Sequence, residues 1–136
     1  MEQWPDGLFF QPTILHNTGR DNPIIKQEVF GPVLAITRFE TDEEVLEQAN
    51  DTEFGLAAGV WTNDIRRAHS MARALQAGTV WINTYRALAF NSPFGGYRSS
   101  GTGRNNGIES INQYLQTKSV WVELSTVAQD PFVMRS

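Results

Sequence analysis

The sequence predicts an α/β fold built on a parallel β-α-β-α-β sheet. Three runs rich in β-branched and aromatic residues alternate with two segments whose apolar residues recur at helical spacing. The connections are long enough for right-handed crossovers, which make consecutive strands parallel. The expected strands cover residues 33–39, 56–62 and 79–83.

The segment before this repeat is expected to contribute only a weak edge strand. Two apolar triplets, residues 8–10 and 13–15, flank Pro12. Because proline lacks a backbone donor, we expect this strand to be short or interrupted. Further along, Pro32 keeps Gly31 out of the helical region, so the chain breaks sharply before the repeat begins.

Each expected helix has its own start signal. Thr41 and Glu44 form a capping box at the start of a helix that ends near Asn50. Asn63 is the expected N-cap of the second helix, and Gly78 stands where a glycine often ends a helix. The residues expected on one face of the second helix are Ile65, Ala68, His69, Ala72 and Leu75.

A glycine-rich loop over residues 90–107 follows the last strand of the repeat. Five of the eleven glycines lie between residues 95 and 107. A loop this long in a compact domain is uncommon and usually functional when it is ordered. Phe94 and Tyr97 give it apolar groups to pack, which a flexible linker lacks. Since ligands of open parallel sheets bind beyond the carboxyl ends of the strands, we favour a functional loop over a purely structural one.

The end of the chain is expected to hold two further elements. Residues 108–115 suggest a short helix, and residues 117–124 alternate as a half-exposed strand. That strand is either internal or an edge for pairing with a partner subunit. Residues 125–136 have no periodicity and are expected to form a loose tail.

Composition argues against several function classes. The net charge is −4 and no basic stripe is present, which argues against nucleic acid or an anionic membrane as partner. The absence of cysteine excludes a disulfide framework, a thiolate metal site and a cysteine nucleophile within this chain. His16 and His69 are far apart, so no metal site is expected. The acidic, polar start and the absence of a long apolar run lead us to expect a soluble, cytoplasmic protein.

Three candidate residues lie next to turns. Glu28 precedes the break at Phe30, and its carboxylate could accept hydrogen bonds from two vicinal sugar hydroxyls while the ring packs on a flat heterocycle. A solvated loop carboxylate is the simpler interpretation from spacing alone. Arg86 follows the third strand and could hold a carboxylate, although exposed arginines more often have no specific role. Arg104, among the glycines, is expected to hold the loop down.

A dinucleotide fingerprint in the glycine loop is rejected. The run from Gly101 to Gly107 has Asn106 where the third glycine should stand, and it does not join a strand directly to a helix.

Five segments, in order, resemble the C-terminal part of the aldehyde dehydrogenase superfamily. They cover nearly the whole chain, about residues 7–124. They are Gly7-Leu-Phe-Phe-Gln-Pro-Thr13, Glu28-Val-Phe-Gly-Pro-Val33, Asn50-Asp-Thr-Glu-Phe-Gly-Leu-Ala-Ala58, Leu75-Gln-Ala-Gly-Thr-Val-Trp-Ile-Asn83, and Ser92-Pro-Phe-Gly-Gly-Tyr-Arg98 with Ser100-Gly-Thr-Gly-Arg104.

The resemblance implies an NAD- or NADP-dependent oxidation of an aldehyde to a carboxylic acid. It assigns Glu28 to the nicotinamide ribose hydroxyls and Phe30 to the nicotinamide ring. It places Phe94 in the lining of the substrate tunnel, with Leu88 and Arg86 where members of the family vary that lining. Arg98 stands where lysine is common.

The resemblance also implies what this chain lacks. The family's cofactor-binding Rossmann domain, nucleophilic cysteine and general-base glutamate precede the matching region, so no residue here is assigned a catalytic role and the chain alone is expected to be inactive. Residues 1–116 would belong to the catalytic domain, and residues 117–136 would form an oligomerisation strand and tail. Residues 119–124 would join a homo-oligomer. The alternative is a non-catalytic, truncated homologue that acts only as a folding or oligomerisation module.

Overall fold

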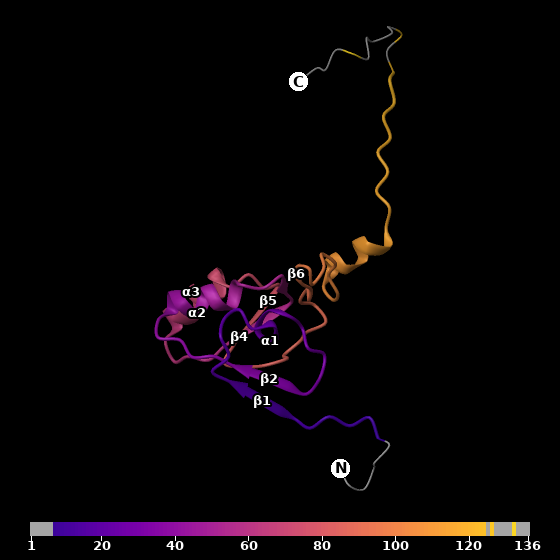
Figure 1. Ribbon diagram of the computed structural model, residues 1–136. Helices are drawn as coiled ribbons and strands as arrows, with labels where there is room; N and C mark the ends of the chain where they lie inside the picture. The colour runs from indigo at the N-terminus through magenta and orange to yellow at the C-terminus, as the bar shows by residue number, and fades with distance from the viewer. Residues whose placement is uncertain (1–6, 125, 127–131, 133–136) are drawn as a thin grey trace.

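The computed structural model describes residues 7–124, 126 and 132, and its elements are short (Figure 1). In chain order they are β1 (Thr13–His16), α1 (Pro23–Lys26), β2 (Val33–Ile36), α2 (Asp42–Asn50), β3 (Phe54–Gly55), β4 (Ala57–Val60), α3 (Ile65–Ala74), β5 (Thr79–Ile82), β6 (Tyr97–Arg98) and the 3₁₀ helix η1 (Ile108–Tyr114). The class is therefore α/β, as expected.

The strands pair two by two within the described part of the chain. β1 and β2 are parallel, with Thr13 opposite Val33. β4 and β5 are parallel, with Ala57 opposite Thr79, and α3 connects them. β3 and β6 form a two-residue antiparallel pair. The crossover from β4 through α3 to β5 is the second half of the expected repeat, which is confirmed.

The expected single sheet of three consecutive strands is wrong. β2 pairs with β1 and not with β4. Pro12 does not prevent this, because it lies just before the first paired residue and removes no donor from the ladder. The Thr13 amide donates to the Pro32 carbonyl at 2.9 Å, so the N-terminal segment forms a genuine parallel strand.

The start of α2 agrees with its capping box. The Glu44 amide donates to the Thr41 hydroxyl at 3.1 Å. The Glu44 carboxylate reaches one residue further back than a standard box requires and accepts from the Glu40 amide at 2.8 Å. Both contacts satisfy backbone donors at the beginning of the helix.

The cap of α3 is Asp64, and the expectation of Asn63 is wrong. Asp64 has extended dihedrals, and its Oδ1 accepts from the amides of Arg66 at 2.8 Å and Arg67 at 3.1 Å. Asn63 and Asp64 are both good N-cap residues, so only the position of the first helical turn distinguishes them.

We expect Asp64→Ala to lower the free energy of unfolding by about 1 kcal/mol, because two amide donors lose their acceptor. Urea denaturation of the intact protein that carries this sequence measures the change. Asn63→Ala is the matched control and should have little effect. A larger loss in Asn63→Ala than in Asp64→Ala would contradict the assignment of the cap.

The packing of α3 defines what little core the chain has. α3 contacts β4 and β5 on one side and α2 on another, and Figure 1 shows the two helices side by side. Ala68 and Met71 are the only buried apolar side chains among the described residues. Ile65 and His69 are exposed, so the expected apolar face of this helix is only partly correct.

The chain exposes far more surface than a folded monomeric protein of the same mass. Its accessible surface is 12156 Å², whereas a folded monomer of 15.3 kDa exposes about 7,100 Å². Part of the excess lies on the β1–β2 pair, where Ile14, Leu34 and Ile36 share one exposed face. Such an apolar surface indicates an interaction site.

The chain leaves η1 as an extended arm (Figure 1). The strand expected over residues 117–124 is not formed in the described chain. Val120, Trp121 and Val122 are between 72% and 92% exposed. The tail expected over residues 125–136 lies outside the described residues, apart from positions 126 and 132. In the described part of the chain, no helix is both long enough and apolar enough to cross a membrane.

Candidate functional site

The glycine loop is closed on itself by backbone hydrogen bonds. Phe94 and Asn105 exchange two bonds of 2.7 Å, and the Gly107 amide donates to the Phe90 carbonyl at 2.9 Å. Inside the loop, Nη1 of Arg104 donates to the carbonyls of Gly96 and Gly103, each at 2.9 Å. The expectation that Arg104 holds the loop down is therefore confirmed.

The loop packs tightly on the connection before β5. A Cβ atom placed on Gly78 would overlap the carbonyl oxygen of Gly95. Gly78 also donates its amide to the Gly55 carbonyl at 3.0 Å. The expectation that Gly78 ends the helix is wrong, because α3 ends at Ala74 and Gly78 lies beyond the C-cap. It is required where two backbones meet.

Glu28 lines a cavity of about 500 Å³, which we call the Glu28 cavity. Besides Glu28, its polar lining residues are Asn50, Thr52, Gln76, Ser99 and Ser100, and most of the remaining lining, such as Phe54 and Leu56, is apolar. The Asn50 side chain bridges the far wall, since it donates to the Ala74 carbonyl at 3.0 Å and accepts from the Gln76 amide at 2.8 Å. A carboxylate among neutral polar groups suits a ligand that carries hydroxyl donors.

Phe30 lies two residues beyond Glu28 and is 98% exposed. It does not line the Glu28 cavity, so the described chain does not bring these two predicted cofactor residues into one pocket. Its ring is available to pack on a ligand or on another part of a larger protein.

The described chain brings Leu88 and Phe94 together, and their place in a substrate tunnel stays a prediction. Both line a hollow of about 200 Å³, together with Thr79, Ala87, Ser92 and Pro93, which we call the Phe94 hollow. The indole Nε1 of Trp81 donates to the Ala87 carbonyl at 2.8 Å and fixes the chain just before Leu88. The lining is mainly apolar, which suits the body of a small organic substrate.

Arg86 lies apart from that hollow. Its guanidinium lies over the Tyr85 ring at 5.9 Å, and its φ of 57° is in the left-handed region. Tyr85 in turn packs edge-on against Trp81, with ring centroids 5.6 Å apart. Arg86 is therefore close in sequence to the Phe94 hollow without lining it.

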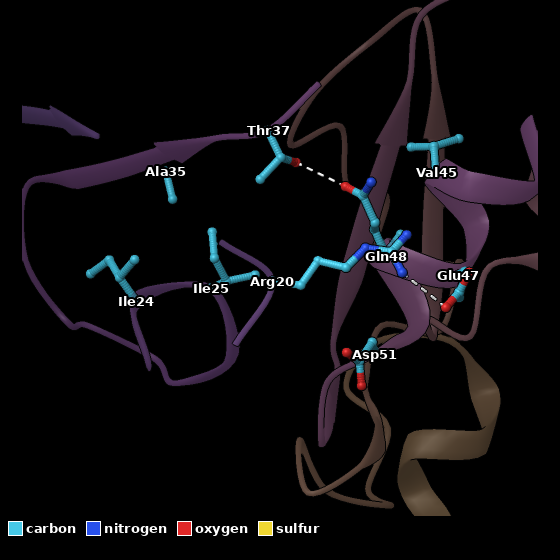
Figure 2. A pocket seen from close by; sticks show the side chains of 10 residues that line it. Arg20, Ile24, Ile25, Ala35, Thr37, Val45, Glu47, Gln48 and Asp51 are labelled. Carbon is cyan, nitrogen blue, oxygen red and sulfur yellow. Dashed lines mark hydrogen bonds and ion pairs between the residues drawn. The ribbon is translucent and has the colours of Figure 1, made fainter. Parts of the chain in front are cut away.

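A second hollow, of about 250 Å³, lies between α1, β2 and α2 and was not predicted (Figure 2). Arg20 pairs with Glu47 at 3.0 Å, and the Thr37 hydroxyl donates to Gln48 at 3.1 Å. On the same side of α2, the Asp51 carboxylate raises the pKa of the Lys26 ammonium, 3.0 Å away, above its ordinary value of 10.5. The Lys26–Asp51 pair joins the end of α1 to the end of α2, and the other two contacts join the segments beside α1 and β2 to α2. The stabilisation from Lys26 is present below pH 10.5 and is lost as the pH rises through the raised pKa.

Metal chemistry has no support in the described residues. Across residues 7–124 with 126 and 132, no group of three or more His, Asp or Glu side chains could hold a metal ion. His16 lies in β1 and His69 in α3.

Comparison with known proteins gives one consistent result. A model of the "Aldehyde dehydrogenase family" matches residues 1–120. The 4-trimethylaminobutyraldehyde dehydrogenase of Rattus norvegicus is 54% identical over 121 residues, which are 89% of this chain and 24% of that protein.

Solved structures agree with this match. A mutant of the Bacillus cereus aldehyde dehydrogenase superposes with a TM-score of 0.81 and 46% identity, over 88% of this chain and 24% of that one. A mutant of P. syringae AldA indole-3-acetaldehyde dehydrogenase, solved with NAD+ and IAA, gives a TM-score of 0.77 and 44% identity, over 83% of this chain and 23% of that one. The chain thus spans about a quarter of the length of these relatives.

Proposed function

The chain belongs to the aldehyde dehydrogenase family, and from this premise we propose that it supplies the C-terminal part of the catalytic domain of an enzyme that oxidises an aldehyde to a carboxylic acid. The observation that carries the proposal is the 46% identity with a solved family member at a TM-score of 0.81 over 88% of the chain. The match to only a quarter of that member supports a role as one portion of a larger catalytic unit.

The cofactor is proposed to be NAD or NADP. When bound, the nicotinamide supplies the hydride acceptor for aldehyde oxidation. The Glu28 carboxylate, in a cavity whose lining also carries neutral polar side chains, fits the ribose hydroxyls, and the exposed ring of Phe30 fits a flat heterocycle. The P. syringae neighbour was solved with NAD+, which supports this choice.

The substrate is proposed to be a small aldehyde whose body lies against Phe94 and Leu88. Their shared apolar hollow supports this role. Arg86 is proposed to lie further out along the tunnel, where an anionic substrate group would meet it. The relatives named above are dehydrogenases of 4-trimethylaminobutyraldehyde and of indole-3-acetaldehyde, so members of this family act on aldehydes with different side groups.

The chemical step is proposed to need groups from outside this chain. The sequence contains no cysteine, so it provides no thiolate to attack the aldehyde carbon. We propose that residues 1–116 complete the catalytic domain around a nucleophile held elsewhere, and that a Rossmann domain outside this chain binds the rest of the cofactor.

Aldehyde-dependent reduction of NAD or NADP by the intact protein that carries this sequence tests the proposal. We expect reduction by the intact protein and none by the 136-residue chain alone. An intact protein that associates but reduces neither cofactor, with any aldehyde of a broad panel, would favour the non-catalytic folding or oligomerisation module.

Residues 119–124 are proposed to join a homo-oligomer by adding a strand to a neighbouring subunit. The exposed side chains of Val120, Trp121 and Val122 support this, because pairing would cover them. We expect removal of residues 117–136 from the intact protein to lower its oligomeric mass in light scattering. Replacing Val120 and Val122 with threonine, which retains β-branching, is the milder companion change. An unchanged mass in the truncated protein would contradict the role of this segment.

A further inference from the structure

We propose that Arg98 is a positioning residue that fixes the Glu28 cavity relative to the Phe94 hollow. The inference rests on the proposed function for what these two sites hold. A single stretch of the glycine loop lines both, because Phe94 lies in the hollow while Ser99 and Ser100 lie in the wall of the cavity. Arg98 lies between these two ends of the stretch.

The Arg98 side chain holds the turn that follows α2. Its Nη1 donates to the Asn50 carbonyl at 2.8 Å and also to the Thr52 carbonyl. The last carbonyls of a helix lack partners within the helix, so this guanidinium satisfies the Asn50 carbonyl at the end of α2 as well as the Thr52 carbonyl in the turn beyond it. Asn50 and Thr52 are themselves part of the Glu28 cavity.

The backbone on either side of Arg98 joins the same turn. β6 pairs with β3, the Ser99 amide donates to the Glu53 carbonyl at 3.0 Å, and the Gly55 amide donates to the Ser100 hydroxyl at 3.0 Å. Arg98 has a φ of 52°, which is unfavourable for a residue with a Cβ atom. Its side-chain contacts offset that cost and keep the loop in one conformation.

The connection extends to the opposite wall of the cavity. The Asn50 side chain bridges the Ala74 carbonyl and the Gln76 amide. Two residues later, Gly78 abuts Gly95, next to Phe94. The contacts of Arg98 therefore join the Glu28 cavity to the stretch that carries Phe94. We infer that losing them misaligns the aldehyde with the nicotinamide.

The chemistry of the contact predicts which substitution is tolerated. Both bonds come from one nitrogen, so the forked geometry that distinguishes arginine from lysine is not used. A lysine ammonium, with three donors, can contact the same two carbonyls. Arg98→Lys should therefore retain the link, and Arg98→Met, which keeps the stem without a donor, should lose it.

The test compares Arg98→Met, Arg98→Lys and the control Arg66→Met in the intact protein. Arg66 is exposed on α3. In Arg98→Met we expect amide exchange over residues 50–56 and 94–100 to accelerate together, and kcat to fall about tenfold with a smaller change in KM for the aldehyde, because the loss is one of alignment. Arg98→Lys should restore both, and the control should match the wild type.

Unchanged exchange in Arg98→Met, or faster exchange with an unchanged kcat, would overturn the proposal. If Arg98→Met does not fold, Arg98→Gly, which suits the left-handed φ, removes the side chain without backbone strain and should show the same two losses. If the wild-type protein oxidises no aldehyde, the proposed function fails, and the exchange comparison alone decides whether Arg98 joins the two sites.

Discussion

Gly78→Ala is expected to destabilise the intact protein by about 3 kcal/mol, near the upper end of the cost of overpacking. The added methyl group would overlap the Gly95 carbonyl oxygen and would also come within 2.8 Å of the Gly95 carbonyl carbon. Both atoms are backbone, so no side-chain rotation relieves the clash. The loop must move away, and the Phe94 hollow opens with it.

Urea denaturation gives the loss of stability, and Gly19→Ala is the matched control. Gly19 has no heavy atom within 4 Å of an added Cβ, so the same substitution there should be nearly neutral. Equal stability of the two variants would contradict the close packing of the glycine loop against the connection before β5.

Glu28→Gln is expected to lower kcat of the intact enzyme by roughly ten- to a hundredfold and to raise KM for the cofactor. The amide keeps the size of the side chain but removes the negative charge and half of the acceptor oxygens. The ribose hydroxyls would then be held less firmly, and the nicotinamide would spend less time aligned with the aldehyde. Glu28 is exposed, so the change should leave stability unaltered.

Steady-state kinetics with the cofactor varied measures this effect, and Glu43→Gln is the control. Glu43 is an exposed carboxylate in the first turn of α2 and does not line the Glu28 cavity. If kcat and the cofactor KM of Glu28→Gln equal those of the wild type, the role given to Glu28 is wrong.

Local sequence signals predicted the elements better than their partners. The crossover from β4 to β5 was evident from strand composition and helical periodicity, and Thr41 was identified from its spacing to Glu44. The pairing of β2 with β1 was not evident from the sequence. A half-exposed strand can pair with either neighbour, and the choice depends on contacts between residues distant in sequence. Asn63 and Asp64 are adjacent cap formers, so the helix start was wrong by one residue.

In the candidate site, too, the residues were easier to predict than the contacts between them. Leu88 and Phe94 were predicted to line the substrate tunnel; both line one hollow, beside the point where Phe94 and Asn105 close the loop. That closure is a backbone contact that no residue pattern encodes. The sequence marks Arg98 only as a position where the family often has lysine. Its hydrogen bond to the turn after α2 accompanies the pairing of β3 with β6, which the sequence does not predict. The roles of Glu28 and Phe30 remain predictions.

The most direct test of the central claim is the mass of the protein that carries this sequence in its source cells. An antibody raised against the 136-residue chain would capture it. We expect a polypeptide several times heavier than 15.3 kDa, because the chain matches only 24% of its relatives and buries only two apolar side chains among its described residues. A product of 15.3 kDa that copurifies with no complementary dehydrogenase portion would contradict the account and favour a non-catalytic module.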